Sequence, residues 1–341
     1  MQTKTAKIST KVTMTLIMAF FLCISAWGQG SVGSRSSAAR NLIWEKKLQR
    51  KVEFLCDTIC HGRATGTIGN IQAATYLERE FRNARIMPIG DTYVKRFRTG
   101  QGEVLGGNVV GFIPGSIKTP KDRYVIVGAH YDHLGDLNGT TYPGADSNAS
   151  GTVALLSLSE MFSVMKTLGK SYNSNIIFVA FDARELSMAG SNAFWEMLEN
   201  GELKDPVSGK TIGPKDIKLM VNIDQIGSTL APLHKDREDY MIMLGKHSLK
   251  PAEKELLSYC NRSTGLHMDL DFTYYGSKNF TDIFYRLSDQ RVFIDNKIPA
   301  VLFTSGITMN TNRTRDTADS LNYTIFKKRI YLIFEWLEKM L

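Results

Sequence analysis

Imidazole and carboxylate side chains follow apolar segments of this sequence at the point where each segment ends. His130 and Asp132 come directly after residues 124–129, in a His-x-Asp arrangement. Asp224 follows residues 218–223 in the same way. Imidazole and carboxylate groups ligate metal ions and transfer protons, so these residue types have the capacity for chemistry. Their shared position after apolar segments points to one polar site.

Four apolar segments, including these two, alternate with helical patterns along the chain. The other two are residues 175–181, which end at Asp182 and Glu185, and residues 299–305, which end near the polar loop 308–316. Continuous apolar strands that alternate with helices predict an α/β fold whose mostly parallel sheet is covered on both faces. Ligands of such sheets bind at the carboxyl ends of the strands. The polar residues above would therefore meet at one edge of the sheet.

Apolar periodicity and turn residues indicate the remaining elements. Ser147 or Asn148 is suited to cap a helix that follows, and this is favoured over a nucleophilic role for Ser147. Phe272, Tyr274 and Tyr275 are either packing residues of an edge segment or the lining of a pocket. Further helices are expected over residues 41–60, 70–84, 190–200, 251–263, 279–287 and 325–340, with strands over 94–98 and 108–112 and a loop over 230–239.

The first 28 residues have the composition of a secretion signal. Lys4, Lys7 and Lys11 precede an apolar stretch, residues 12–25, and a small-x-small site at residues 26–28. The stretch is about fourteen residues, whereas a spanning helix needs about 20. We therefore expect a cleaved signal, an exported product that is periplasmic or extracellular, and no stable membrane span after cleavage. Residues 29–40 are rich in Ser and Gly and are expected to be a flexible leader.

Charge and cysteine content exclude two classes of protein. The formal net charge is +8, and the three signal lysines account for three of it, which leaves +5 for the remainder. No basic stripe with interleaved aromatic residues is present, so nucleic-acid binding has no support. Cys56, Cys60 and Cys260 are too few for a disulfide scaffold. A Cys56–Cys60 disulfide and two buried thiols both stay open.

Ordered motifs over nearly the whole chain after the signal resemble those of one enzyme family. It is the M28 family of zinc exopeptidases, which includes aminopeptidase-like and glutaminyl-cyclase-like enzymes. The resemblance implies a three-layer α/β/α sandwich with a mostly parallel central sheet, formed by residues 41–341. The matching segments are residues 54–77, NVVG at 108–111, GAHYDHLG at 128–135, GADSNASG at 144–151, residues 181–191, NID at 222–224 and DTAD at 316–319.

The resemblance also implies a chemistry, the removal of N-terminal amino acids from peptides by two adjacent zinc ions. A carboxylate bridges the two ions, and a Glu deprotonates the attacking water. Matched to the family pattern, His130, Glu185 and Asp224 are metal ligands of this chain, and Asp132 is the carboxylate that orients His130. These four positions keep residue types that suit their roles.

Three other positions of the pattern carry different chemistry. Ser147 stands where the family has the bridging Asp, Arg184 where it has the general base, and Asn312 where it has a His ligand. A hydroxyl does not bridge two dications as a carboxylate does, and an amide is a poor zinc ligand beside imidazole. Arginine stays protonated at neutral pH and does not accept a proton from water. Loss of a general base alone costs about 10²–10⁴ in rate.

These substitutions leave two hypotheses for function. In the favoured one, the protein has lost catalysis and keeps a cleft for a peptide or peptide-like ligand, with no zinc bound. The guanidinium of Arg184 then takes the place of the metals and pairs with Glu185 or Asp224. In the alternative, the protein is an active metallo-aminopeptidase with an altered site that holds a single zinc. The residues that bind substrate and the oligomeric state are left open by the sequence.

Overall fold

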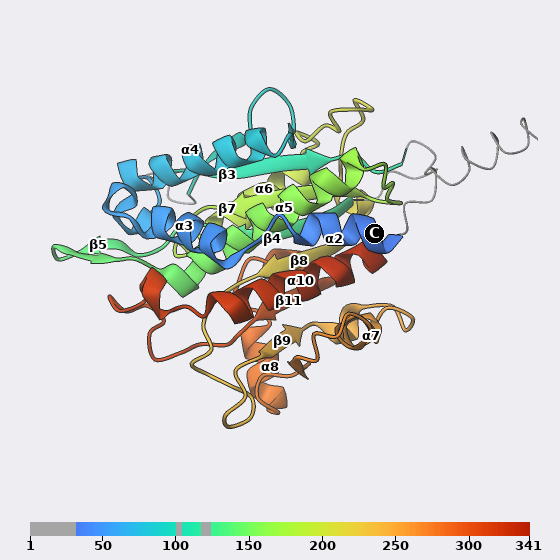
Figure 1. The fold of residues 1–341 in the computed structure, drawn as a ribbon. Coiled ribbons are helices and arrows are strands. Elements are labelled where there is room, and N and C mark those ends of the chain that lie inside the picture. The colour runs from blue at the N-terminus through green and yellow to red at the C-terminus, as the bar shows by residue number, and fades with distance from the viewer. Residues whose placement is uncertain (1–31, 100–103, 117–123) are drawn as a thin grey trace, which may run out of the picture.

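A nine-stranded sheet runs through the centre of the molecule (Figure 1), as seen in a computed structural model that describes residues 32–99, 104–116 and 124–341. Neighbouring strands follow the order β1, β3, β7, β4, β8, β11, β9, β10, and β2 also pairs with β3. Their bounds are Met87–Pro88 (β1), Val94–Arg98 (β2), Leu105–Ile113 (β3), Tyr124–His130 (β4), Asn175–Phe181 (β7), Ile217–Ile223 (β8), Tyr240–Leu244 (β9), Asp269–Asp271 (β10) and Ala300–Thr304 (β11).

The four central strands, β7, β4, β8 and β11, are parallel to their neighbours within this group. β3 joins β7 on one side and β9 joins β11 on the other, both antiparallel. In the register, His130 pairs with Phe181, and Gly128 pairs with Asn222. The strands β4, β7 and β8 therefore end close together, and the residues after them share one edge of the sheet.

Alternate residues of the central strands face opposite sides of the sheet, as the period of a strand requires. Val125 and Val127 belong to the core on one side, where α5 (Gly151–Thr167) and α10 (Tyr323–Met340) run across the sheet (Figure 1). Tyr124 and Ile126 belong to the core on the other side, with Phe194 of α6 (Ala189–Glu199). Both faces are covered, so the expected α/β/α sandwich with a mostly parallel centre is confirmed.

The helices agree with the predicted segments to within a few residues at most boundaries. Helix α3 is shorter than expected, because the chain leaves the helix at Cys56 and enters the turn η1. A hairpin of β5 (Gly135–Leu137) and β6 (Thr140–Tyr142) follows His133. The helices are Glu45–Cys56 (α3), Thr58–Arg63 (η1), Ile68–Asn83 (α4), Ala145–Ser150 (η2), Gly151–Thr167 (α5), Ala189–Glu199 (α6), Leu256–Ser263 (α7), Lys278–Phe284 (α8), Arg291–Asp295 (α9) and Tyr323–Met340 (α10).

The expectation of a flexible leader is wrong for residues 32–40. They form helix α2, Val32–Arg40, in which Ala39 is fully buried. Ser36 Oγ donates a hydrogen bond of 2.7 Å to Glu335 of α10. A Ser- and Gly-rich composition suggested a loose chain, but small residues also allow a helix to pack closely against the domain. The proposed signal, residues 1–28, lies outside the described residues.

Two further expectations concern the cysteines and the membrane. Cys56, Cys60 and Cys260 are free thiols, and burial raises the pKa of Cys60 to about 11. Cys60 Sγ donates to the backbone carbonyl of Phe54 at 3.4 Å. Across residues 32–99, 104–116 and 124–341, no helix combines the length and the apolar character needed to cross a bilayer.

Candidate functional site

Three residues expected at the site lie together at the carboxyl ends of the parallel strands. His130 is the last residue of β4, Asp224 directly follows β8, and Glu185 lies in the turn after β7. His130 Nε2 is 3.4 Å from Asp224 Oδ1, and their side chains are 0% and 7% exposed. The sheet thus places an imidazole against a carboxylate in a position closed to bulk water.

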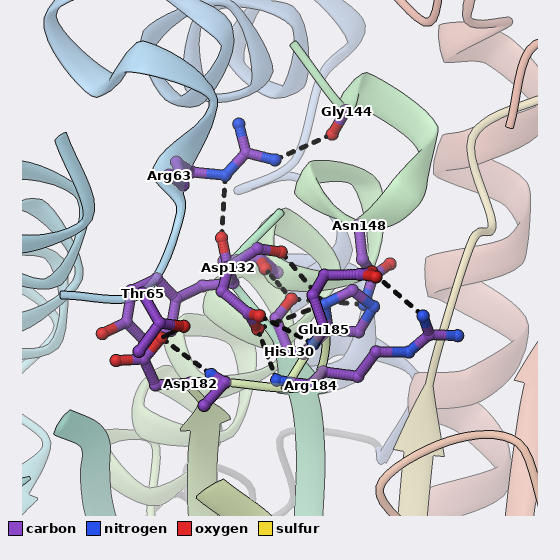
Figure 2. A network of polar contacts seen from close by, with 12 residues as sticks. Arg63, Thr65, His130, Asp132, Gly144, Asn148, Asp182, Arg184 and Glu185 are labelled. Atoms are coloured by element: carbon purple, nitrogen blue, oxygen red, sulfur yellow. Dashed lines mark hydrogen bonds and ion pairs between the residues drawn. The ribbon is translucent and has the colours of Figure 1, made fainter. Parts of the chain in front are cut away.

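Arg184 connects Glu185 to Asp224. Its Nη1 donates to Glu185 Oε1 at 3.0 Å, and its Nη2 lies 4.0 Å from Asp224 Oδ2. Nη2 also donates to the backbone carbonyl of Leu287 at 3.4 Å. Figure 2 shows the guanidinium turned toward Glu185. The side chain at the general-base position is therefore an ion-paired cation.

The Asp132 carboxylate holds the turn after β7 by binding the backbone of Arg184 and Glu185. Its Oδ1 and Oδ2 accept hydrogen bonds of 3.0 Å from the backbone N–H groups of Arg184 and Glu185 (Figure 2). His130 Nδ1 lies 3.1 Å from the backbone carbonyl oxygen of Asp132 and 3.6 Å from its carboxylate. The carboxylate that was expected to orient His130 therefore holds the neighbouring turn, and the carbonyl group of the same residue is nearer to the ring.

The charges of the site act strongly on one another. Burial lowers the pKa of His130, but Asp224 and Asp132 together raise it to about 10. Burial raises the pKa of Asp224, but His130 and then Arg184 hold it below its ordinary value. Burial likewise lowers the pKa of Arg184, and Asp224 and Glu185 more than offset this. The carboxylates of Asp224 and Glu185 therefore face two side-chain cations, the imidazolium of His130 and the guanidinium of Arg184.

The loop before α5 is fixed by Asn148, which sequence reasoning considered only as a helix cap. Its Nδ2 donates to the backbone carbonyls of His130 at 3.3 Å and Ile223 at 2.9 Å. Its Oδ1 accepts from the backbone N–H groups of Gly151 at 3.0 Å and Gln225 at 2.9 Å. One side-chain amide therefore joins the ends of β4 and β8 to the start of α5.

Ser147 does not cap α5. It is buried, and its hydroxyl makes no hydrogen bond within the part of the chain that the structure describes. Its backbone N–H donates to Asp316 Oδ2 at 3.0 Å, and that of Asp146 donates to Asp316 Oδ1 at 2.8 Å. Asp146 turns away to the loop after β8, where its Oδ1 accepts from the N–H of Gly227 at 2.7 Å. Ser147 thus takes part in this network only through its backbone N–H.

Arg63 links three segments of the chain beside the site. It is fully buried, and its Nε donates to the carbonyl of Tyr131 at 2.7 Å. Its guanidinium also donates to the carbonyls of Leu55 and Pro143, and to that of Gly144, which Figure 2 shows. All four acceptors are neutral carbonyl groups, so the guanidinium does not form an ion pair here. Its role is to join three segments through its several N–H donors.

The Asp182 carboxylate also joins several segments, but as a hydrogen-bond acceptor. Oδ1 accepts from Thr65 Oγ1 and Asn70 Nδ2, both at 2.9 Å, and Oδ2 accepts from the backbone N–H of Gly107 at 2.9 Å. Burial and, to a smaller extent, Asp132 raise its pKa to about 6. This network anchors the turn that carries Arg184 to the start of α4 and to β3.

A small pocket of about 50 Å³ opens beside Arg184 and Asp224. Tyr274, one of the three aromatic residues left open between packing and a pocket, does both. Its ring stacks on Phe284 with centroids 3.7 Å apart, and both rings line the pocket. The full lining is Arg184, Asp224, Gln225, Tyr274, Phe284, Leu287, Ser288, Leu302, Thr304 and Ile307.

Ser288 and Asp289 belong to the site region but were not predicted. Ser288 Oγ donates to Asp224 Oδ2 at 2.7 Å and accepts from Asn222 Nδ2 at 2.9 Å. Asp289 is fully buried, and its two carboxylate oxygens have no hydrogen-bond partner among the residues described. No signal in the sequence marked them, because a Ser-Asp-Gln run beside arginines is typical of an exposed loop.

Asn312 is not brought to the other site residues. It lies in an exposed turn with a φ of +57°, and its side chain has no hydrogen bond in the described ranges. The remaining donors do not fit a zinc pair. His130 Nε2 and Asp224 Oδ1 are buried without a hydrogen bond, but Glu185 is bound to Arg184. Among the residues placed by the structure, no group of three His, Cys, Asp or Glu is arranged to hold a metal ion. Catalytic zinc takes three protein ligands.

Comparison with known proteins identifies similar folds and sequences. The model of peptidase family M28 matches residues 108–337. The uncharacterised protein YfbL of Escherichia coli K12 is 24% identical over 342 residues, which cover 90% of this chain and 92% of YfbL.

Two solved structures share the fold. The LapA aminopeptidase of Legionella pneumophila has a TM-score of 0.67 at 17% identity, over 90% of this chain and 73% of that chain. The zinc aminopeptidase BSAP of Bacillus subtilis has a TM-score of 0.63 at 13% identity, over 87% and 95%.

Proposed function

Since this chain belongs to peptidase family M28, we propose that it is an exported member that binds a peptide or peptide-like ligand and has lost the family's zinc-dependent hydrolysis. The observation that carries the proposal is the 3.0 Å contact between Arg184 Nη1 and Glu185 Oε1. A guanidinium at the general-base position does not accept a proton from water. The same contact occupies a carboxylate that a metal would need.

The ligand site is the pocket beside Arg184 and Asp224, with its apolar wall of Tyr274, Phe284 and Ile307. A pocket with apolar walls and a few polar groups at one end favours a ligand with an apolar part and a polar terminus. Export is inferred from the composition of residues 1–28. The proposal involves no nucleic acid and no membrane span of the exported protein.

A second candidate function is an active aminopeptidase that uses a single zinc. The observation in its favour is that His130 Nε2 and Asp224 Oδ1 are buried without a hydrogen bond among the described residues and lie 3.4 Å apart. Zinc bound there would act as a Lewis acid toward a peptide carbonyl. His130 and Asp224 would hold it, and Glu185 would have to leave Arg184 to become the third ligand.

Turnover of aminoacyl-p-nitroanilides by chelator-treated and zinc-supplemented protein distinguishes the two. The first proposal expects no turnover above the uncatalysed rate in either sample, together with a melting temperature that rises when peptides with apolar N-terminal residues are added. Turnover that requires zinc and disappears in His130→Ala would establish the second candidate and refute the first.

A further inference from the structure

The guanidinium of Arg184 contacts three segments that are far apart in the sequence. Nη1 reaches Glu185 in the turn after β7, and Nη2 lies 4.0 Å from Asp224 at the end of β8. Nη2 also donates to the carbonyl of Leu287, in the segment after α8 that forms the pocket wall. Joining the carboxyl ends of β7 and β8 is what a bound metal does when its ligands come from both strands.

The carboxylates around this guanidinium need a counter-charge. Asp224 is 7% exposed and Glu185 is 18% exposed, and Asp289 is fully buried nearby. Carboxylates gathered in one poorly solvated region repel each other unless a cation lies between them. A planar guanidinium has five N–H donors and suits several acceptors at once.

We propose that Arg184 is a positioning residue that replaces the family's metal pair: its guanidinium neutralises Glu185 and Asp224, holds the Leu287 wall of the pocket, and keeps divalent metal away from His130 and Asp224. This inference rests on the proposed function, because a site that kept its catalytic zinc would leave no room for the guanidinium. It adds that one side chain both keeps metal from the three ligand residues that remain and holds the ligand pocket together.

The test is the thermal unfolding of chelator-treated full-length protein with and without added zinc ions. The wild type is expected to melt at the same temperature in both conditions. Arg184→Met is expected to melt at least about 3 °C lower without zinc, because Glu185 loses its ion pair and, among the described residues, Asp224 keeps only His130 as a counter-charge. Zinc is expected to restore part of this loss in Arg184→Met and to restore none of it when His130→Ala is added.

Two control variants separate a local role from a general effect of removing an arginine. Arg184→Lys keeps the charge without the planar fork, so it is expected to lose part of the stability and to show no response to zinc. Arg82→Met breaks an exposed pair with Glu78 and is expected to change neither the melting temperature nor the response to zinc.

Several results would overturn the proposal. One is stoichiometric zinc binding by the wild type in calorimetry, a measurement that does not depend on any variant folding. Another is an Arg184→Met protein that melts like the wild type and ignores zinc. In that last case, absent turnover by the wild type would leave the proposed function standing, whereas zinc-dependent turnover by the wild type would remove both.

Discussion

The Asp132 carboxylate holds Glu185 by its main chain, with a 3.0 Å hydrogen bond from the backbone N–H of Glu185 to Oδ2. The other oxygen accepts from the preceding N–H at the same distance. Both N–H groups lie in the turn after β7, where they have no strand partner. A single buried carboxylate thus shapes the turn from which the Glu185 and Arg184 side chains project.

Asp132→Asn is expected to destabilise the protein by about 1–3 kcal/mol, because an amide has one acceptor oxygen for two N–H donors and leaves one of them unsatisfied. Denaturant unfolding measures the change. Asp136→Asn, in the adjacent exposed hairpin, is the matched control and is expected to stay within about 0.5 kcal/mol of the wild type. Equal losses in both variants would contradict the role assigned to Asp132.

Arg63→Met is expected to cost roughly 2–4 kcal/mol, because it removes the donors for four carbonyl groups from a fully buried position. Arg50→Met, on the exposed face of α3, serves as the control and is expected to be near neutral. Equilibrium unfolding in urea compares the two. A neutral Arg63→Met would mean that the 143–144 segment is held by other contacts.

The stability of the protein is expected to depend on pH through Asp289. Burial raises the pKa of Asp289 to about 7 in the folded state, above its unfolded value of 3.8. The folded state therefore binds this proton more tightly, so the stabilisation is complete below about pH 4 and is lost as pH rises through about 7. Each such group contributes a slope of at most about 1.4 kcal/mol per pH unit in that window.

Asp289→Asn is uncharged throughout this range, so its unfolding free energy is expected to fall less than that of the wild type between pH 4 and pH 7. Other carboxylates titrate in the same range, and the difference between the two profiles isolates Asp289. Asp319→Asn, at an exposed position, provides the control. Parallel profiles for Asp289→Asn and the wild type would refute the assignment.

Gly190→Ala is expected to destabilise the protein by about 1–3 kcal/mol. A Cβ at Gly190 would collide with the backbone carbonyl of Asp182 and lie 2.7 Å from Asn108 Oδ1. Neither group can easily move away, because one is backbone and the other is a buried side chain held by hydrogen bonds. Gly213→Ala is the control, because its nearest neighbour would be an Asp216 oxygen at 3.7 Å. Thermal unfolding of the two variants should separate them clearly.

Restoring the family's residues at positions 147 and 184 is expected to restore zinc binding, whereas restoring the His at position 312 is expected to add little. Ser147→Asp with Arg184→Glu adds carboxylates beside His130 and Asp224, so zinc binding should become measurable by calorimetry. Adding Asn312→His should change the zinc affinity little, since residue 312 lies in an exposed turn away from these residues. A large gain from the third exchange would show that this turn moves to the site.

The central strands were predictable because of how they are buried. The predicted segment matches the bounds of β7 and differs by one or two residues for β4, β8 and β11, since a strand covered on both faces must be apolar throughout. Strand β9 is equally apolar but was not predicted. Across residues 224–239, which the structure describes, no helix separates it from β8, and it runs antiparallel to β11, so the repeated strand-and-helix pattern gave no reason to place a strand there.

The site was predictable only where side chains follow strands directly. His130, Asp224 and Glu185 were assigned from their positions, and the pairing of Arg184 with Glu185 was expected from charge. The contacts of Asp316 with the N–H groups of residues 146 and 147 were not, because they join segments 169 and 170 residues apart. Carboxylates that bind backbone amides leave no periodic signal in a sequence.

The loops of the site are held largely by hydrogen bonds to backbone groups, and this has a consequence for how the site can evolve. The side chains of Asp132, Asn148 and Asp316 hydrogen-bond to backbone N–H and C=O groups. Every residue type except proline has both groups. The side chain at position 147 is therefore replaceable without loosening its loop, since the loop is held there through the backbone N–H. A scaffold built in this way is able to exchange its reactive groups one at a time and keep its shape for a new occupant.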